Sequence, residues 1–369
     1  MITDLLRRRA PAPALPADSA LPAAEAVDLK DPAAVAEVEA WLAARPSTPF
    51  HRPAWLLAVE RATGHRALVL ARRGAGGAIA GLLPLHVIRS PLFGRALVST
   101  GFGVRGGILA DDGDAARALA ARCWSLADSL GCTTAELRGG AVGLPGWEER
   151  ADTYLNFAKP LAPDDEQQLA QIPKRHRAEV RKGLANDLRF EVGDSSRLRD
   201  AHYRLYARSV HRLGTPVFPR KLFDEVLDAF GSGADIAMVS DASGEPLSAV
   251  ITLYHQDAAM PYWHGAGEEA RATRSNEVLY FRLMSHARAR GLRVFDFGRS
   301  KAGTGPAAWK HNWGWPAEPL TYAVRTAPGA RPRDMNPLSP GNRRKVEMWK
   351  RLPLLLANMI GPLIAMDLG

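Results

Sequence analysis

This 369-residue chain contains only two cysteines and no long apolar run. Cys123 and Cys132 have no histidine or further cysteine at metal-site spacing, so we expect two buried small hydrophobes and no metal. The absence of about 18 consecutive apolar residues argues against a membrane-spanning helix. Three arginines in the first ten residues precede no apolar segment, so no signal peptide is indicated and we expect a cytoplasmic protein.

Positive charge is abundant instead, with a net charge of +9 that is concentrated in two segments. Residues 171–190 carry six basic and two acidic side chains, and residues 326–369 carry seven and three, a net +4 in each. Such concentration favours phosphate-bearing partners, including nucleotide- or lipid-linked sugars, nucleotide cofactors, tRNA or an anionic membrane face. A solvated helix face followed by a basic tail explains the same charges, and this alternative stays open.

The order of expected elements repeats along the chain, which indicates an α/β protein with two related halves. At 46% hydrophobic residues, the chain is long enough for two cores. Each half contains an expected run of strand, strand, strand, helix and strand. These elements lie at 67–72, 78–88, 96–100, 115–130 and 133–137 in the first half, and at 236–240, 247–255, 259–265, 276–290 and 292–297 in the second.

This repeat divides the chain into four expected parts. Residues 1–27, rich in alanine and proline, read as a flexible leader. We expect an N-terminal domain at 28–165 and a C-terminal domain carrying the site at 166–325. In the tail, 326–369, the apolar segment 349–366 is too short to span a bilayer. It is either an interfacial anchor in peripheral contact with the inner membrane, or a tail packed on the body or on a second subunit.

The strongest functional signal is the segment Phe295–Lys301. Asp296 lies between two phenylalanines near the C-terminal end of an expected strand, where open α/β sheets commonly place ligands. Arg299 and Lys301 follow directly in the turn. We therefore expect Asp296 to act in catalysis and the two cations to bind substrate.

A lysine between two tryptophans follows, in Trp309-Lys310-His-Asn-Trp313. We expect Lys310 to lie over or beside the aromatic faces, aimed at a phosphate or at the oxyanion of an acyl-transfer intermediate, with both tryptophans contacting substrate. A surface lysine is the plainer interpretation. Since a solvent-facing lysine contributes little stability, we expect Lys310→Ala to reduce turnover and to leave the fold intact.

Tyr262 and His264 alternate onto one face of the neighbouring strand. There they could supply a hydrogen bond or a general base, although a half-buried structural histidine is the alternative for His264.

Two further groups of cations are candidates for substrate binding. Lys174, Arg177 and Arg181 fall at i, i+3 and i+7, which places them in one stripe of a helix that could grip a phosphate chain. Arg271 and Arg274 lie between the third strand and the helix of the second half, where their guanidinium groups could hold a phosphate or carboxylate. A solvated loop explains these two arginines equally well.

Several of these motifs match a known pattern. Phe295-Asp-Phe-Gly298 and Trp309-Lys-x-x-Trp313-Gly314, together with the basic helix at 174–186 and the paired α/β halves, resemble the FemAB-like branch of the GNAT acyltransferase superfamily. The string 296–305 and the tail segment 349–353 are similar to the FemAB-related proteins associated with PEP-CTERM/exosortase systems.

The resemblance implies tandem GNAT-like domains, each with a mixed central sheet flanked by helices, and acyl or aminoacyl transfer to an amine. Well-studied relatives take amino acids from aminoacyl-tRNA and add them to a peptidoglycan precursor, and the lysine matching Lys310 lies in their active site. In GNAT N-acetyltransferases, a glycine-containing loop before the helix binds the pyrophosphate. Residues 271–276 lack that glycine, and tryptophans replace the usual phenylalanines around Lys310, so donor and acceptor do not carry over.

We therefore expect an acyltransferase that acts on an amine of a sugar or lipid-linked saccharide, in exopolysaccharide or cell-envelope biosynthesis. Acyl-CoA or aminoacyl-tRNA would be its donor substrate, with no permanently bound cofactor and no DNA partner. Because no convincing nucleophile with an adjacent base occurs, we expect direct attack by the amine. An aminoacyl-tRNA-dependent peptidyltransferase and a non-catalytic glycan-precursor-binding protein remain the alternatives.

Overall fold

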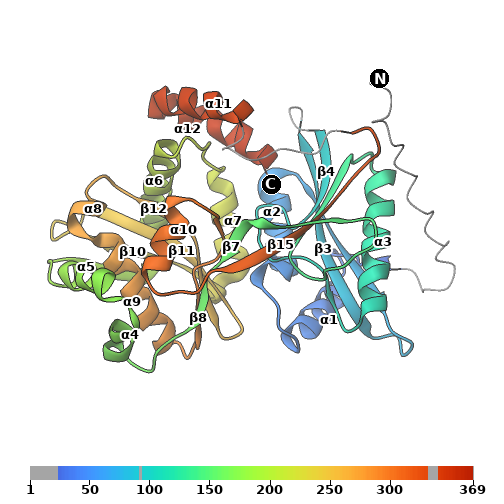
Figure 1. The fold of residues 1–369 in the computed structure, drawn as a ribbon, viewed down its shortest axis with the longest axis horizontal. Coiled ribbons are helices and arrows are strands. Elements are labelled where there is room, and N and C mark those ends of the chain that lie inside the picture. The colour runs from blue at the N-terminus through green and yellow to red at the C-terminus, as the bar shows by residue number, and fades with distance from the viewer. Residues whose placement is uncertain (1–23, 91–93, 331–339, 369) are drawn as a thin grey trace, which may run out of the picture.

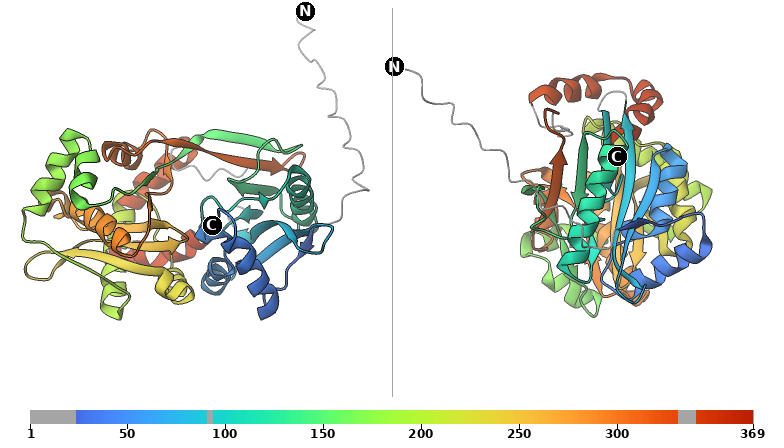
Figure 2. Two further views of the ribbon diagram at one scale, coloured as in Figure 1. Left: turned by 90° about the horizontal axis from the view of Figure 1, so that it is seen from below. Right: turned by 90° about the vertical axis from the view of Figure 1, so that its right-hand side faces the viewer.

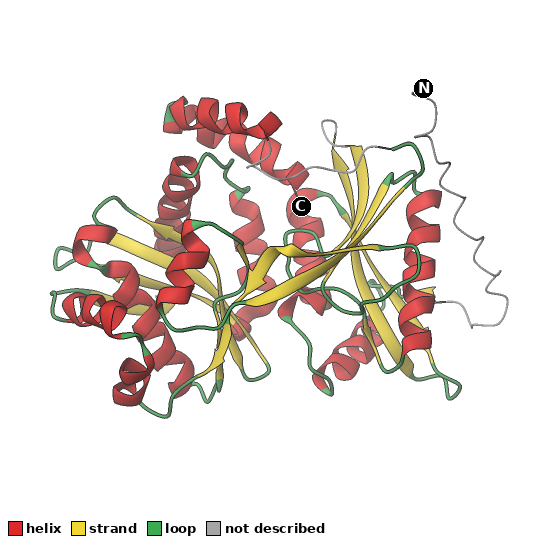
Figure 3. Ribbon diagram, viewed as in Figure 1, coloured by secondary structure: helices red, strands yellow, loops and turns green. Residues whose placement is uncertain are grey.

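Two mixed β-sheets, each covered by helices on both faces, make up the protein (Figures 1 and 3). The computed structural model describes residues 24–90, 94–330 and 340–368, so most of the expected leader lies outside the described residues. The expected order of three strands, a helix and a strand is found in both halves. The expected α/β class with mixed central sheets flanked by helices is confirmed.

The first sheet contains nine strands within the described residues, eight of them in the order β1-β2-β3-β4-β6-β15-β7-β14, with β5 paired to β3. Its parallel pair is β4 and β6. Alternating residues of β2 face opposite layers, because Leu68 and Leu70 pack with α3 whereas Val69 and Ala71 pack with α1 and α2. The bounds are β1 Glu25–Ala26, β2 Arg66–Arg73, β3 Ile79–Ser90, β4 Gly94–Ser99, β5 Leu109–Ala110, β6 Thr134–Arg138, β7 Glu148–Asn156, β14 Ser300–Lys301, β15 Glu318–Thr326, α1 Pro32–Ala43, α2 Pro53–Thr63 and α3 Gly113–Ser129.

The second sheet has six strands within the same ranges, in the order β8-β13-β12-β11-β10-β9. Its parallel pair, β12 and β13, is joined at only two positions, Ala258 with Val294 and Ala259 with Phe295, although β12 continues to Ala266. The bounds are β8 Ala158–Pro160, β9 Arg189–Gly193, β10 Ala234–Ser240, β11 Pro246–His255, β12 Ala258–Ala266, β13 Val294–Asp296, α4 Asp165–Gln171, α5 Lys174–Leu184, α6 Ser196–Arg212, α7 Arg220–Phe230, α8 Ala270–Thr273, α9 Ser275–Ala289 and α10 Gly305–Asn312.

Strand pairing crosses the expected boundary at residues 165/166 in both directions. Strand β8, which precedes it, belongs to the second sheet, whereas β14 and β15, which follow it, belong to the first. Figure 1 shows β7 and β15 running between the two halves. The four-part division of the chain remains a prediction, but the two sheets are built from exchanged strands.

The two halves also share one hydrophobic core. Helices α2 and α7 pack against each other, and Trp55 of α2 stacks on Trp263 of β12 with ring centroids 5.6 Å apart. Both cysteines are buried and unpaired, as expected.

The C-terminal helices α11 Pro340–Arg351 and α12 Leu354–Ala365 lie along one edge of the molecule (Figures 1 and 2). They contact both halves: His211 Nε2 lies 3.0 Å from the Leu352 carbonyl oxygen, and His65 Nε2 lies 2.7 Å from that of Met366. Of the helices in the described ranges, none has the length and apolarity needed to cross a bilayer.

The contact between α6 and β12 depends on Gly265. A Cβ atom at this residue would lie 2.2 Å from the Tyr206 backbone nitrogen and 2.5 Å from the Leu205 carbonyl carbon. Backbone atoms cannot yield as a flexible side chain can, so only glycine allows the helix to approach the strand this closely.

We expect Gly265→Ala to lower the free energy of unfolding by about 1–3 kcal/mol, because the added methyl group forces α6 away from the sheet. Gly76→Ala is the matched control, since a Cβ there meets no atom within 4 Å. Urea unfolding of the two variants checks this, and equal midpoints would contradict the close approach.

Candidate active site

The central feature of the site is a crossing of two chain segments between the sheets. One segment passes from β7 through Phe157 into β8, and the other passes from β13 through Phe297 into β14. The Phe297 backbone nitrogen donates to the Phe157 carbonyl oxygen at 2.8 Å. The predicted residues Asp296, Arg299 and Lys301 therefore lie where the chain leaves one sheet for the other.

Lys310 reaches this crossing from α10. Its Nζ donates to the carbonyl oxygens of Phe297, Gly298 and Arg299 at 2.6, 3.0 and 3.1 Å. Its ammonium group lies 5.7 Å from the ring centroid of Phe157. Burial lowers the pKa of Lys310 to about 7, and the nearby Asp296 carboxylate opposes that shift. The expectation that Lys310 is aimed at a phosphate or an oxyanion is wrong in orientation, because its three donors hold the turn after β13.

The flanking tryptophans differ in their surroundings. Trp313 is fully buried, with its ring 4.8 Å from that of His176, so the expected direct contact with substrate is wrong for this residue. Trp309 is half-buried, and its Nε1 donates to Glu277 Oε1 at 3.3 Å. Burial raises the pKa of the Glu277 carboxyl. Glu277 was not predicted from the sequence, and no motif marks it.

Asp296 forms an ion pair across the two halves. Its Oδ2 accepts from Arg105 Nη1 at 2.7 Å, and its Oδ1 accepts from the Gly298 backbone nitrogen at 2.8 Å. Burial raises the pKa of Asp296, while Arg105 opposes the shift. Arg105 was missed because it lies almost 200 residues away in sequence. The glycine-rich loop 101–107 around it was the available signal, and Arg105 itself adopts a φ of +55° there.

Arg299 and Tyr262 also lie at the junction of the two halves. Arg299 Nη1 donates to the Tyr322 hydroxyl at 2.7 Å, and its guanidinium lies 4.4 Å from the ring centroid of Tyr154. The Tyr262 hydroxyl donates to the Phe102 carbonyl oxygen at 2.6 Å. Lys301 lies in β14, opposite Tyr154 of β7.

His264 points toward the start of α9. Its Nε2 lies 3.0 Å from Asn276 Oδ1, which can only accept, so Nε2 carries the proton and Nδ1 is left as an acceptor. Burial lowers the pKa of His264 to about 4, and the positive charge of Lys310 contributes to the shift. The Nδ1 lone pair can accept a hydrogen bond, but a pKa of about 4 makes this imidazole a weak base near neutral pH.

The predicted cations of α5 form a separate surface. Within the described residues, Lys174, Arg177 and Arg181 form no ion pair, and Lys174 and Arg181 are exposed. Arg271 of α8 is exposed as well. These four cations are placed to meet an anionic partner.

Arg274 is engaged within the protein. Its Nε donates to Glu179 Oε2 at 2.5 Å, which ties α5 to the start of α9, and its Nη1 contacts the Arg271 carbonyl oxygen. Lys182 and Arg274 lower the pKa of Glu179 to about 2. The expectation that Arg274 is open to a phosphate is wrong in this structure.

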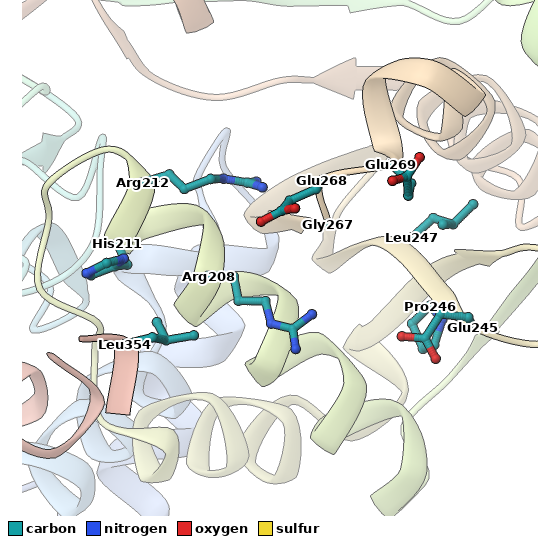
Figure 4. Close-up of a pocket in the computed structure, with 10 residues that line it drawn as sticks. All are labelled: Arg208, His211, Arg212, Glu245, Pro246, Leu247, Gly267, Glu268, Glu269 and Leu354. Atoms are coloured by element: carbon teal, nitrogen blue, oxygen red, sulfur yellow. The ribbon is translucent and has the colours of Figure 1, made fainter. Parts of the chain in front are cut away.

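Two pockets flank these elements. One, of about 570 Å³, lies between α6 and the β12–α8 loop, where arginines face Glu268 and Glu269 (Figure 4). None of the predicted site residues lines it. The second, of about 480 Å³, is lined by Phe157 and by residues of α10, the helix that carries Lys310.

Comparisons with known proteins agree with this architecture. Residues 171–311 match the family model described as an acetyltransferase (GNAT) domain. No curated protein sequence matches the chain. The chain is accordingly an enzyme of the transferase class, and the matched segment runs from the end of α4 to α10.

Several solved structures share the fold at low sequence identity. FemX has a TM-score of 0.63 and 15% identity, covering 78% of this chain and 95% of its own. The C-terminal domain of a putative lysylphosphatidylglycerol synthetase from Agrobacterium fabrum has a TM-score of 0.53 and 14% identity. The match covers 79% of this chain and 92% of that domain. A tandem GNAT protein from the clavulanic acid biosynthesis pathway has a TM-score of 0.52 and 15% identity. The match covers 84% of this chain and 100% of that protein. The fold is therefore the expected tandem GNAT-like fold.

We expect Lys310→Ala to lower the free energy of unfolding by about 1–3 kcal/mol, because three carbonyl oxygens at the crossing lose their donor. This replaces the expectation of an intact fold. Thermal melting measures the change, with Lys221→Ala on the exposed start of α7 as control. Equal melting temperatures would show that the turn does not need the ammonium group.

We expect Arg105→Gln to lower the free energy of unfolding by about 1–3 kcal/mol near neutral pH, because the buried Asp296 carboxylate loses its cation. The variant raises the folded-state pKa of Asp296 further. A raised carboxyl pKa disfavours the charged form. The loss in free energy of unfolding therefore grows as pH rises, and it disappears where Asp296 is protonated in both proteins.

Urea unfolding at pH 5 and pH 8 measures this deficit. Arg45→Gln, which breaks the more exposed pair with Asp111, should lose less than about 1 kcal/mol. A deficit for Arg105→Gln that shrinks with rising pH would contradict the assignment.

Proposed function

We propose that this chain, with its acetyltransferase (GNAT) domain over residues 171–311, transfers an acyl or aminoacyl group to an amine of a sugar or lipid-linked saccharide. We place it in the FemAB-like branch and, on the string 296–305 and the tail segment 349–353, in its PEP-CTERM-associated subfamily. Exopolysaccharide or cell-envelope biosynthesis in the cytoplasm is the setting that this placement favours.

The observation that carries the proposal is the packing of α5, the helix with the free cations, against the helix that carries the candidate base Glu277. Helix α5 contacts α9, which carries Glu277, and His176 of α5 lies against Trp309 and Trp313 in the segment that carries Lys310. A phosphate-bearing donor held by α5 would thus be bound to a helix that packs directly against the one carrying the Glu277 carboxylate.

The reaction follows from these groups. The acceptor amine attacks the carbonyl carbon of the bound thioester or ester, the new C–N bond forms, and the thiolate or ribose oxygen leaves. The amine proton passes to the Glu277 carboxylate, which burial makes a stronger base than His264 Nδ1, and the leaving group takes up a proton. Lys310 and the Arg105–Asp296 pair hold the crossing that frames the site, which makes them positioning residues.

Both donor classes carry phosphates, and the exposed cations on α5 and α8 suit either one. Acyl-CoA would need a compact phosphate site. Aminoacyl-tRNA would use a broader surface, and the exposed positions of Lys174, Arg181 and Arg271 favour it as the second candidate.

We expect the melting temperature to rise with the true donor, because a ligand that binds only the folded state stabilises it. Acetyl-CoA, longer acyl-CoAs and charged tRNA are compared by thermal shift, and the CoA thioesters also by thiol release. The double variant Arg177→Gln/Arg181→Gln should weaken donor binding at least about tenfold, as expected for two lost charge-assisted contacts.

The matched control is Arg282→Gln, because Arg282 is exposed but lies on α9 and not on α5. Stabilisation by CoA thioesters alone supports the acyl-CoA donor, and stabilisation by charged tRNA alone supports the aminoacyl donor. If neither stabilises the protein and no thiol is released, the non-catalytic alternative replaces the proposal.

A further inference from the structure

Helix α12 presents most of its large aliphatic side chains to solvent and its small side chains to the protein. Five large aliphatic residues are between 41% and 74% exposed, namely Leu355, Leu356, Met359, Ile360 and Leu363. At about 100° per residue they fall within an arc of about 140°. Ala357, Gly361 and Ala365 lie on the opposite side and are buried. The usual arrangement of a surface helix is reversed.

The helix is nevertheless held in place. A Cβ at Gly361 would lie 3.1 Å from Val217, so the small face fits closely against the second half. At the C-terminal end, Ser90 Oγ donates to Asp367 Oδ2 at 2.9 Å, next to the contact of His65 with the Met366 carbonyl. The aliphatic face is therefore fixed outward by contacts at both ends. On α11, Met348 adds a further exposed large side chain.

The segment of the sequence that carries this face is basic. Residues 340–368 contain five basic residues and two acidic ones, none of them within α12. Arg351 is exposed just before α12, and Arg208 of α6 lines the pocket that Leu354 borders (Figure 4). Glu268 and Glu269 lie on that pocket too, and Glu347 is paired with Lys350 at 3.0 Å.

We propose that α12 docks on an anionic lipid surface, with its aliphatic face among the acyl chains and Arg351 and Arg208 at the headgroups. A helix of 12 residues is about 18 Å long and lies in the interface without crossing it. The inference goes beyond the proposed function and does not rest on it.

A second copy of the chain fits this face less well. A two-fold contact would bring the same basic segment of both copies together, which is unfavourable. Five or six exposed large residues are also far fewer than the roughly 20–30 residues per side of a stable interface.

Co-sedimentation of the full chain with vesicles tests the proposal. We expect binding to phosphatidylcholine vesicles containing phosphatidylglycerol, and weaker binding to phosphatidylcholine alone. The triple variant Leu355→Gln/Met359→Gln/Leu363→Gln should bind at least about tenfold more weakly, because it removes most of the inserted apolar surface. Val142→Gln, at an exposed valine before β7, should bind as the unchanged protein does.

Arg351→Gln should reduce binding to the anionic vesicles only. Equal vesicle binding by the triple variant and the unchanged protein, or no preference for anionic vesicles, would overturn the proposal. So would a dimer that forms without lipid and is lost in the triple variant, which would assign the face to a second copy. The effect of acyl-CoA and of charged tRNA on the melting temperature is measured separately, since the exposed side chains of α12 are remote from α5 and the crossing.

Discussion

The rest of the structure depends on the crossing at Phe157 and Phe297. Here two segments exchange sheets side by side, and one hydrogen bond of 2.8 Å joins them. A crossing of this kind leaves carbonyl groups that no regular ladder satisfies, and buried carbonyls need donors. Lys310 supplies three donors at once, and the Gly298 backbone nitrogen is held by Asp296. The exchanged strands are therefore joined through a half-buried cation at the junction.

This arrangement explains why Lys310 and Asp296 both have perturbed pKa values. Lys310 and Asp296 are partly desolvated together, and each favours the charged form of the other. Arg105 brings the glycine-rich loop of the first half onto the same carboxylate. Because the site is framed by both sheets, its geometry depends on how the two halves sit against each other, and the shared packing of α2 on α7 fixes that relation.

The sequence predicted the strands and the helix of the repeated unit well, but neither the strands β7, β8, β14 and β15 nor the contacts between elements. Alternating apolar residues and glycine turns are local signals, so the hairpin of β2 and β3 and the helix α9 were expected close to their observed bounds. The pairing of β15 with β6 and β7, and of Arg105 with Asp296, joins residues far apart along the chain, and no local pattern records such pairs. The flanking tryptophans single out Lys310 in the sequence, but the direction of its side chain depends on the crossing, which the sequence does not reveal.

The C-terminal tail shows how two opposed interpretations can both describe one helix. A tail packed on the body requires an apolar face toward the protein, and an interfacial anchor requires one toward lipid. In α12 the small residues meet the first requirement and the large ones meet the second, because the two sets fall on opposite sides of the helix. Hydrophobicity averaged along the segment cannot separate these roles. The distribution of side-chain size around the helix can, and here it places the larger apolar surface outside the protein.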